Sequence, residues 1–210
     1  MRLSVLFRTG FLASACLVAS AVYAAGAMLK APEQLELDGQ VYQLGGRQNL
    51  PQQLSWQYTT GGEKAAGWNW TRLLTLNQIN IGKASLETWA QATETNFNRQ
   101  KPQPWSHFET RPDQAWVQVI FPPDASHPTY ESHAWHGQMV PGCGGLLVVQ
   151  FSRQIAAAAS AVGAAVPAEV QQQNDADMAA LKKLAWQADC PRSARPATKP
   201  EASAASAAVE

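Results

Sequence analysis

Residues 85–99 read SLETWAQATETNFNR, and this stretch decides the predicted fold. Ser85 stands where its side chain can accept the free amides of a first helical turn. The residues that follow recur at helical spacing on one face: Leu86, Trp89, Ala90, Thr93 and Phe97. We therefore predict an amphipathic helix over residues 86–99 that packs this face against another element.

Segments with strand patterns flank the helix on both sides. Before it, Asp38-Gly39 is typical of a two-residue hairpin turn between residues 35–37 and 41–42. Further strands are predicted over residues 54–59, 67–81, 116–121, 130–139 and 145–155. Within residues 67–81 the apolar positions change parity, which indicates either a bulge near residues 72–74 or a strand covered on both sides. Residues 140–144, VPGCG, are predicted to be the turn of a hairpin.

A second helix is predicted over residues 168–188, with Met178, Leu181, Leu184 and Ala185 on one face. The alanine-rich residues 156–168 are either a linker or the start of this helix. The order of elements predicts one α+β domain over residues 35–190: a mostly antiparallel sheet of about five to seven strands, with both helices packed on one face. We expect a flexible segment at residues 25–34 and a disordered tail at residues 191–210.

Residues 1–24 have the composition of an export signal. Arg2 and Arg8 precede an uncharged run over residues 11–24, which ends in small residues and is short for a membrane span. We expect cleavage after Ala24 or Ala27 and a periplasmic location. The residues before Cys16 do not favour lipoprotein anchoring.

The bulk composition excludes some classes of partner. The chain has 16 basic and 16 acidic side chains, and its densest basic cluster is Lys182-Lys183, so we do not expect nucleic-acid binding. No later apolar run is long enough to span a bilayer, so no transmembrane segment is expected after signal cleavage. The sequence indicates no oligomeric state.

Two cysteines, Cys143 and Cys190, follow the predicted signal. A lone pair of cysteines in an oxidising compartment predicts a disulfide. As an alternative, Cys143 in its glycine-rich turn would act as a nucleophile, with His133 or His136 on the preceding strand as its base. A reactive cysteine more often lies at a helix N-terminus, and here a strand follows, so we assign no catalytic residue.

His127, His133 and His136 are close in sequence but have the wrong spacing for a shared metal. On a strand, His133 and His136 point to opposite faces because they are three positions apart, an odd number. Glu131 shares a face with His133, which leaves a two-group site for an outside ligand. We assign no metal and no cofactor.

The chain has eight tryptophans, and most lie at positions that face a core. Trp105 is expected in an exposed loop, and we predict a contact surface formed by Trp105 with Tyr130 and Trp135, provided that their strand is an edge. No nucleophile elbow, phosphate loop or metalloprotease helix is present in the sequence.

The first functional hypothesis is therefore an exported, non-catalytic accessory or binding domain acting on another envelope component, either a protein or a glycan. One alternative is a small hydrolase or metal-dependent enzyme centred on Cys143 with His133 or His136. Another is an immunity or inhibitor protein.

Overall fold

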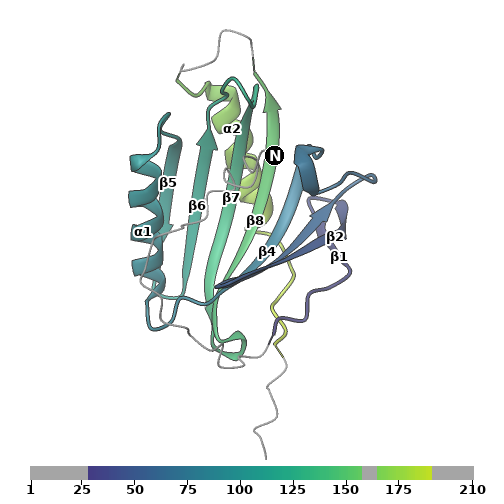
Figure 1. Ribbon diagram of the computed structural model, residues 1–210, viewed down its shortest axis with the longest axis vertical. Helices are drawn as coiled ribbons and strands as arrows, with labels where there is room; N and C mark the ends of the chain where they lie inside the picture. The colour runs from purple at the N-terminus through teal and green to yellow at the C-terminus, as the bar shows by residue number, and fades with distance from the viewer. Residues whose placement is uncertain (1–27, 158–164, 191–210) are drawn as a thin grey trace, which may run out of the picture.

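The computed structural model describes residues 28–157 and 165–190, which form one antiparallel eight-stranded sheet and two helices (Figure 1). The strands are β1 (Gln34–Leu37), β2 (Gln40–Leu50), β3 (Gln53–Thr59), β4 (Arg72–Ile79), β5 (Trp105–Thr110), β6 (Gln114–Phe121), β7 (Thr129–Val140) and β8 (Gly145–Ala156). The helices are α1 (Leu86–Arg99) and α2 (Ala168–Leu181). Across the sheet the order is β1-β2-β3-β4-β8-β7-β6-β5. The predicted α+β class is confirmed, but the sheet has one strand more than expected because β5 was not predicted.

The local turn and cap signals are confirmed. Asp38 and Gly39 have φ angles of 51° and 70°, as the two-residue turn between β1 and β2 requires. The Ser85 hydroxyl accepts a hydrogen bond from the Thr88 amide at 3.1 Å and caps α1. β7 and β8 form the expected hairpin, joined through a short 3-10 turn at Pro141–Cys143.

The strand expected over residues 67–81 is shorter than predicted. Gly67 has a φ of 77° and belongs to a 3-10 turn, Ala66–Trp68, so the strand begins only at Arg72. β4 pairs with β3 and β8 without a shift of register and is buried on both faces. The change of parity among the apolar positions of residues 67–81 therefore reflects a strand that is covered on both faces. The bulge in this part of the sheet lies in β2, between Leu44 and Gly46.

The two helices cover opposite faces of the sheet, and the expectation that both pack on one face is wrong. On one face, Trp89 and Phe97 of α1 pack in a core cluster with Val117 and Trp135. On the other face, Val170 of α2 packs with Ile120 and Tyr130, and Met178 with Ala134. Because β6, β7 and β8 carry buried side chains of both parities, each face needs its own covering layer.

Polar contacts fix α2 to the sheet. Arg153 of β8 forms an ion pair with Asp177, and its Nε donates to Asp177 Oδ2 at 2.9 Å. Asn174 is fully buried, and its amide donates to Ser132 Oγ at 2.8 Å and to the His133 carbonyl at 2.9 Å. These bonds set the position of α2 along β7 and β8 as well as its distance from the sheet.

The second helix ends at Leu181, seven residues before the predicted end at residue 188. Beyond it, Leu184, Trp186, Ala188 and Cys190 pack alternately against the core as extended chain. Cys190 forms a disulfide with Cys143, as predicted. An extended chain advances about 3.3 Å per residue against 1.5 Å in a helix, and this greater reach brings Cys190 to the far end of the β7–β8 hairpin.

The segment before β1, which we expected to be flexible, is held against the domain from Leu29 onward. Leu29 is buried and its amide donates to Gln78 Oε1 at 3.0 Å, while the Lys30 amide donates to the Asp189 carbonyl at 2.9 Å. The predicted signal over residues 1–24 and the predicted tail over residues 191–210 lie outside the described residues, as does most of the alanine-rich linker.

Candidate functional site

The structure does not bring Cys143 together with either candidate base. Cys143 is bonded to Cys190 and so has no free thiol in this structure. His133 lies on the α1 side of the sheet and contacts the Phe121 and Trp135 rings. His136 lies on the α2 side, where it stacks on Trp116 at a centroid distance of 3.8 Å. The predicted opposite orientation of the two histidines is therefore confirmed.

Burial changes the pKa of His136. Desolvation lowers the pKa of His136 to about 4, although the Asp113 carboxylate acts in the opposite direction. The ring therefore stays neutral near pH 7. On the same side of the sheet, the Lys182 ammonium lies 5.3 Å from the centroid of the Trp116 ring. This arrangement is that of an aromatic stack beneath a cation.

His133 belongs to a buried polar cluster with Glu131, Gln150 and Ser152. His133 Nδ1 lies 2.8 Å from Ser152 Oγ and 3.0 Å from Gln150 Nε2. On the other side of the ring, His133 Nε2 lies 3.2 Å from Glu131 Oε1. Gln150 Nε2 also donates to Ser152 Oγ at 2.9 Å. A serine, a histidine and a glutamate are thus aligned through the two nitrogens of one imidazole.

This alignment resembles a nucleophile, base and orienting carboxylate in its order of groups. Ser152 and His133 are only 1% and 2% exposed, however, so the hydroxyl cannot be reached by a substrate in this conformation. Among the described residues, both Glu131 oxygens and His133 Nε2 lack a hydrogen-bond partner of good geometry. The Ser152–His133 contact is a hydrogen bond, but the His133–Glu131 contact lacks hydrogen-bond geometry, and the structure gives the cluster no access for a reactant.

The described part of the chain contains no group of three metal-binding side chains. His127 lies in the loop before β7, where its Nδ1 is 3.3 Å from Asp124 Oδ1 and its ring is 4.7 Å from that of Trp68. Glu131 and His133 do share a face, as predicted, but no third such ligand joins them among the described residues. The three histidines thus have three separate environments.

The contact surface predicted from Trp105, Tyr130 and Trp135 is not continuous. β7 lies between β6 and β8, so it is not an edge, and Tyr130 and Trp135 are buried on opposite faces. Trp105 is the first residue of β5, not part of a loop, and is half-buried against Ile120 and Tyr130. The strand that Trp105 begins, however, is an edge strand.

β5 has a free backbone edge in the described structure, because its only pairing partner there is β6. Antiparallel neighbours alternate between residues that exchange backbone hydrogen bonds and residues that do not. The Arg111 amide donates to the Gln114 carbonyl at 2.8 Å, so Glu109, two residues earlier, also directs its backbone groups toward β6. Ser106, Phe108 and Thr110 therefore direct their amides and carbonyls away from the sheet.

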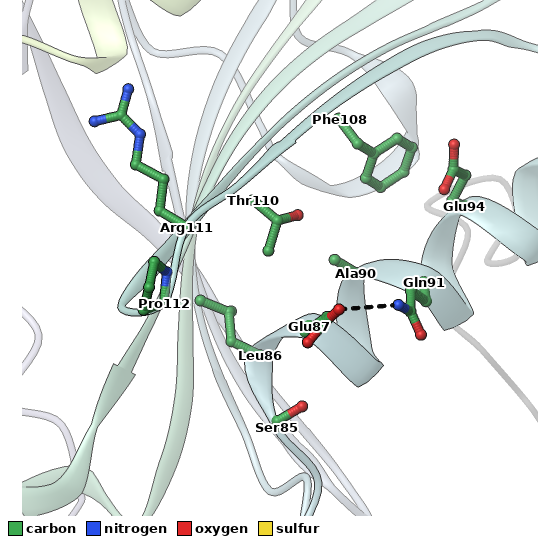
Figure 2. Close-up of a pocket in the computed structure, with 10 residues that line it drawn as sticks. All are labelled: Ser85, Leu86, Glu87, Ala90, Gln91, Glu94, Phe108, Thr110, Arg111 and Pro112. Atoms are coloured by element: carbon green, nitrogen blue, oxygen red, sulfur yellow. Dashed lines mark hydrogen bonds between the residues drawn. The ribbon is translucent and has the colours of Figure 1, made fainter.

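The side chains of these same three residues lie on the α1 side. Phe108 contacts Phe97 of α1 at a centroid distance of 6.0 Å, and its neighbours at two-residue spacing share its face. A pocket of about 510 Å³ opens here between α1 and β5. Figure 2 shows Phe108 and Thr110 of β5 facing Leu86, Ala90 and Glu94 of α1 across this pocket. An open strand edge and a side-chain pocket are thus placed side by side.

The charges around the pocket are mostly negative. Glu87 and Glu94 project from the exposed side of α1, and Glu87 Oε1 accepts from Gln91 Nε2 at 3.3 Å. Arg111 also lines the pocket, but its guanidinium points away from α1 (Figure 2) and pairs with Glu109. This ion pair also lowers the pKa of the Glu109 carboxyl, with a further contribution from Lys182.

The residues of this edge site were missed because β5 was not predicted. Residues 105–110, WSHFET, do carry a strand signal, since Trp105, Phe108 and Thr110 are of the aromatic and β-branched types that are enriched in strands. Arg111-Pro112-Asp113 then provides a turn signal before β6. Gln150 and Ser152 were missed for a different reason: only the register of β8 against β7 places them beside His133.

The chain is a small α+β domain. Its antiparallel sheet is covered by one helix on each face and has an open edge beside a pocket. A protein-family model matches residues 29–186, which is most of the chain, and the chain belongs to that family. No curated protein and no solved structure matches the chain significantly.

Proposed function

We propose that this chain is an exported, non-catalytic binding domain that captures an extended segment of another envelope protein along the free edge of β5. The observation that carries the proposal is the combination of outward-facing backbone groups at Ser106, Phe108 and Thr110 with a pocket directly beside them. Addition of a strand to an exposed edge is a common mode of peptide recognition, in which backbone bonds provide affinity and side-chain pockets provide specificity.

Export is supported by the disulfide and by the sequence of the first 24 residues. Disulfides persist in oxidising compartments such as the periplasm, and Cys143 is bonded to Cys190. Neither described helix is long and apolar enough to cross a membrane. Together with Arg2, Arg8 and the uncharged run that follows them, these features support a periplasmic location.

The enzymatic alternative has less support. The disulfide removes the thiol on which a hydrolase centred on Cys143 would depend. The Ser152, His133 and Glu131 alignment lies beneath the surface, and none of the three lines the pocket. An immunity or inhibitor protein would use the β5 edge in the same way, with a secreted enzyme as its partner.

The proposal is tested by selecting extended peptides from a displayed random library on the immobilised protein, with two variants as controls. Thr110→Pro removes an outward amide hydrogen while leaving the bonds to β6 in place, and Thr110→Val keeps the amide and the side-chain shape. We expect the wild type and Thr110→Val to enrich the same peptides and Thr110→Pro to enrich none. Equal enrichment on all three proteins would contradict capture at this edge.

A further inference from the structure

The pocket beside β5 has a chemistry that selects one kind of side chain in the captured segment. We infer that the segment carries a lysine or arginine at the position that faces α1 beside Phe108 and Thr110. This inference rests on the proposed function, because it assumes that a strand pairs with β5.

The register of such a strand determines which of its side chains enter the pocket. A residue that exchanges backbone bonds with Phe108 or Thr110 lies directly opposite it, and paired residues in a sheet place their side chains on the same face. Phe108 and Thr110 face α1 and line the pocket. Every second residue of the captured segment therefore points toward α1, and one of them enters the pocket.

The walls of the pocket suit a long aliphatic stem. Leu86 and Ala90 of α1, Phe108 of β5 and Pro112 of the following turn supply apolar surface. A volume of about 510 Å³ exceeds what a small side chain would fill. Lysine and arginine bury their methylene stems along apolar surface while their charged ends remain in water.

The rim of the pocket suits a positive charge at the end of that stem. Glu94 lies on the Phe108 side of the pocket (Figure 2). Glu87 lies about two turns earlier in α1, toward the start of the helix. Both carboxylates belong to exposed residues of α1. Arg111 does not neutralise them, because its guanidinium is paired with Glu109. A cation near the Phe108 ring would also gain from the ring quadrupole.

The same charges exclude other segments. An acidic side chain in this position would face Glu87 and Glu94 with no free cation beside it among the pocket residues. Like charges placed together in this way provide specificity by repulsion. The site therefore distinguishes basic from acidic segments more strongly than it distinguishes basic from neutral ones.

The test uses three synthetic strand-forming peptides that differ only in the central residue, which is lysine, norleucine or glutamate. Norleucine keeps the apolar stem without the charge. Binding to the wild type, to Glu94→Gln and to Glu36→Gln is followed by the NMR shifts of the β5 amides at low salt. Glu36→Gln is the matched control, since Glu36 is an exposed glutamate of β1 at the opposite edge of the sheet.

We expect the wild type and Glu36→Gln to bind the lysine peptide roughly fivefold or more tightly than the glutamate peptide, and Glu94→Gln to lose most of this preference. Binding of the norleucine peptide should be the same for all three proteins. Equal binding of all three peptides through β5 would overturn the inference and leave the proposed function standing. If no peptide shifts the β5 amides, both the inference and the proposed function fail.

Discussion

The Arg111 amide donates to the Gln114 carbonyl at 2.8 Å, and this bond at the β5–β6 turn determines which residues of β5 face the open edge. Because backbone direction alternates along a strand, Glu109 faces β6 and Thr110 faces outward. The capture proposal depends on this alternation, which a pair of substitutions can test in the free protein.

Thr110→Pro is expected to lower the free energy of unfolding by less than about 1 kcal/mol, because proline is tolerated at an edge where no ladder bond is lost. Glu109→Pro is expected to lower it by roughly 2–3 kcal/mol, because it removes a bond to β6. Urea unfolding measures both values, and Glu109→Ala corrects for the ion pairs that Glu109 forms with Arg111 and Lys182. If the two proline variants lose the same stability, the assigned alternation is wrong.

The Cys143–Cys190 disulfide closes a loop with a sequence separation of 47. Replacing both cysteines with serine is expected to lower the free energy of unfolding by about 4 kcal/mol. Without the cross-link, the unfolded chain of the variant has the entropy that the bond removes from the wild type. Chemical denaturation of the double variant beside the oxidised wild type gives this difference. A loss below about 1 kcal/mol would show that the bond does not stabilise the fold by restricting the unfolded chain.

His136 should make the protein less stable in mild acid. Its pKa is about 4 in the folded protein and 6.5 in the unfolded chain, so the unfolded chain takes up the proton first as the pH falls. Stability is therefore lost between about pH 6.5 and pH 4, at up to about 1.4 kcal/mol per pH unit. His136→Phe keeps a ring on Trp116 and removes the titration. Its stability should depend less steeply on pH than that of the wild type, and parallel curves would refute this assignment.

Asp177→Ala is expected to destabilise the protein by roughly 2–4 kcal/mol, because it leaves the Arg153 guanidinium without its partner beneath α2. The Asp177 carboxylate also raises the pKa of Arg153, so the charge persists at every accessible pH. Combining Asp177→Leu with Arg153→Met should recover part of the loss, because no unpaired charge then remains. Failure of the double variant to improve on Asp177→Ala would mean that the cost does not come from the unpaired guanidinium.

Local signals predicted most of the elements, because each acts within a few residues. Ser85 caps α1, Asp38-Gly39 forms a hairpin turn, and both ends of α1 lie where the pattern placed them. The signals failed where tertiary contacts decide. Leu184 fits the helical spacing that begins at Met178, but the chain becomes extended after α2 and carries Cys190 to Cys143.

The candidate site was less predictable than the fold. Trp105 begins the edge strand β5, but its position after Pro102 and Pro104 suggested a loop and concealed that strand. The sequence pattern placed Glu131 and His133 on one face, yet it could not show that β7 is central and that both side chains are buried. Strand order is a property of the whole sheet, and no local pattern encodes it.

The most direct test of the central claim is amide hydrogen exchange of β5, measured by NMR with and without a peptide selected on the wild type. In the free protein we predict fast exchange at Ser106, Phe108 and Thr110 and slow exchange at His107 and Glu109. Bound peptide should slow exchange at the first three residues and leave the other two unchanged. Protection of Phe108 in the free protein, or peptide protection confined to other strands, would contradict capture at this edge.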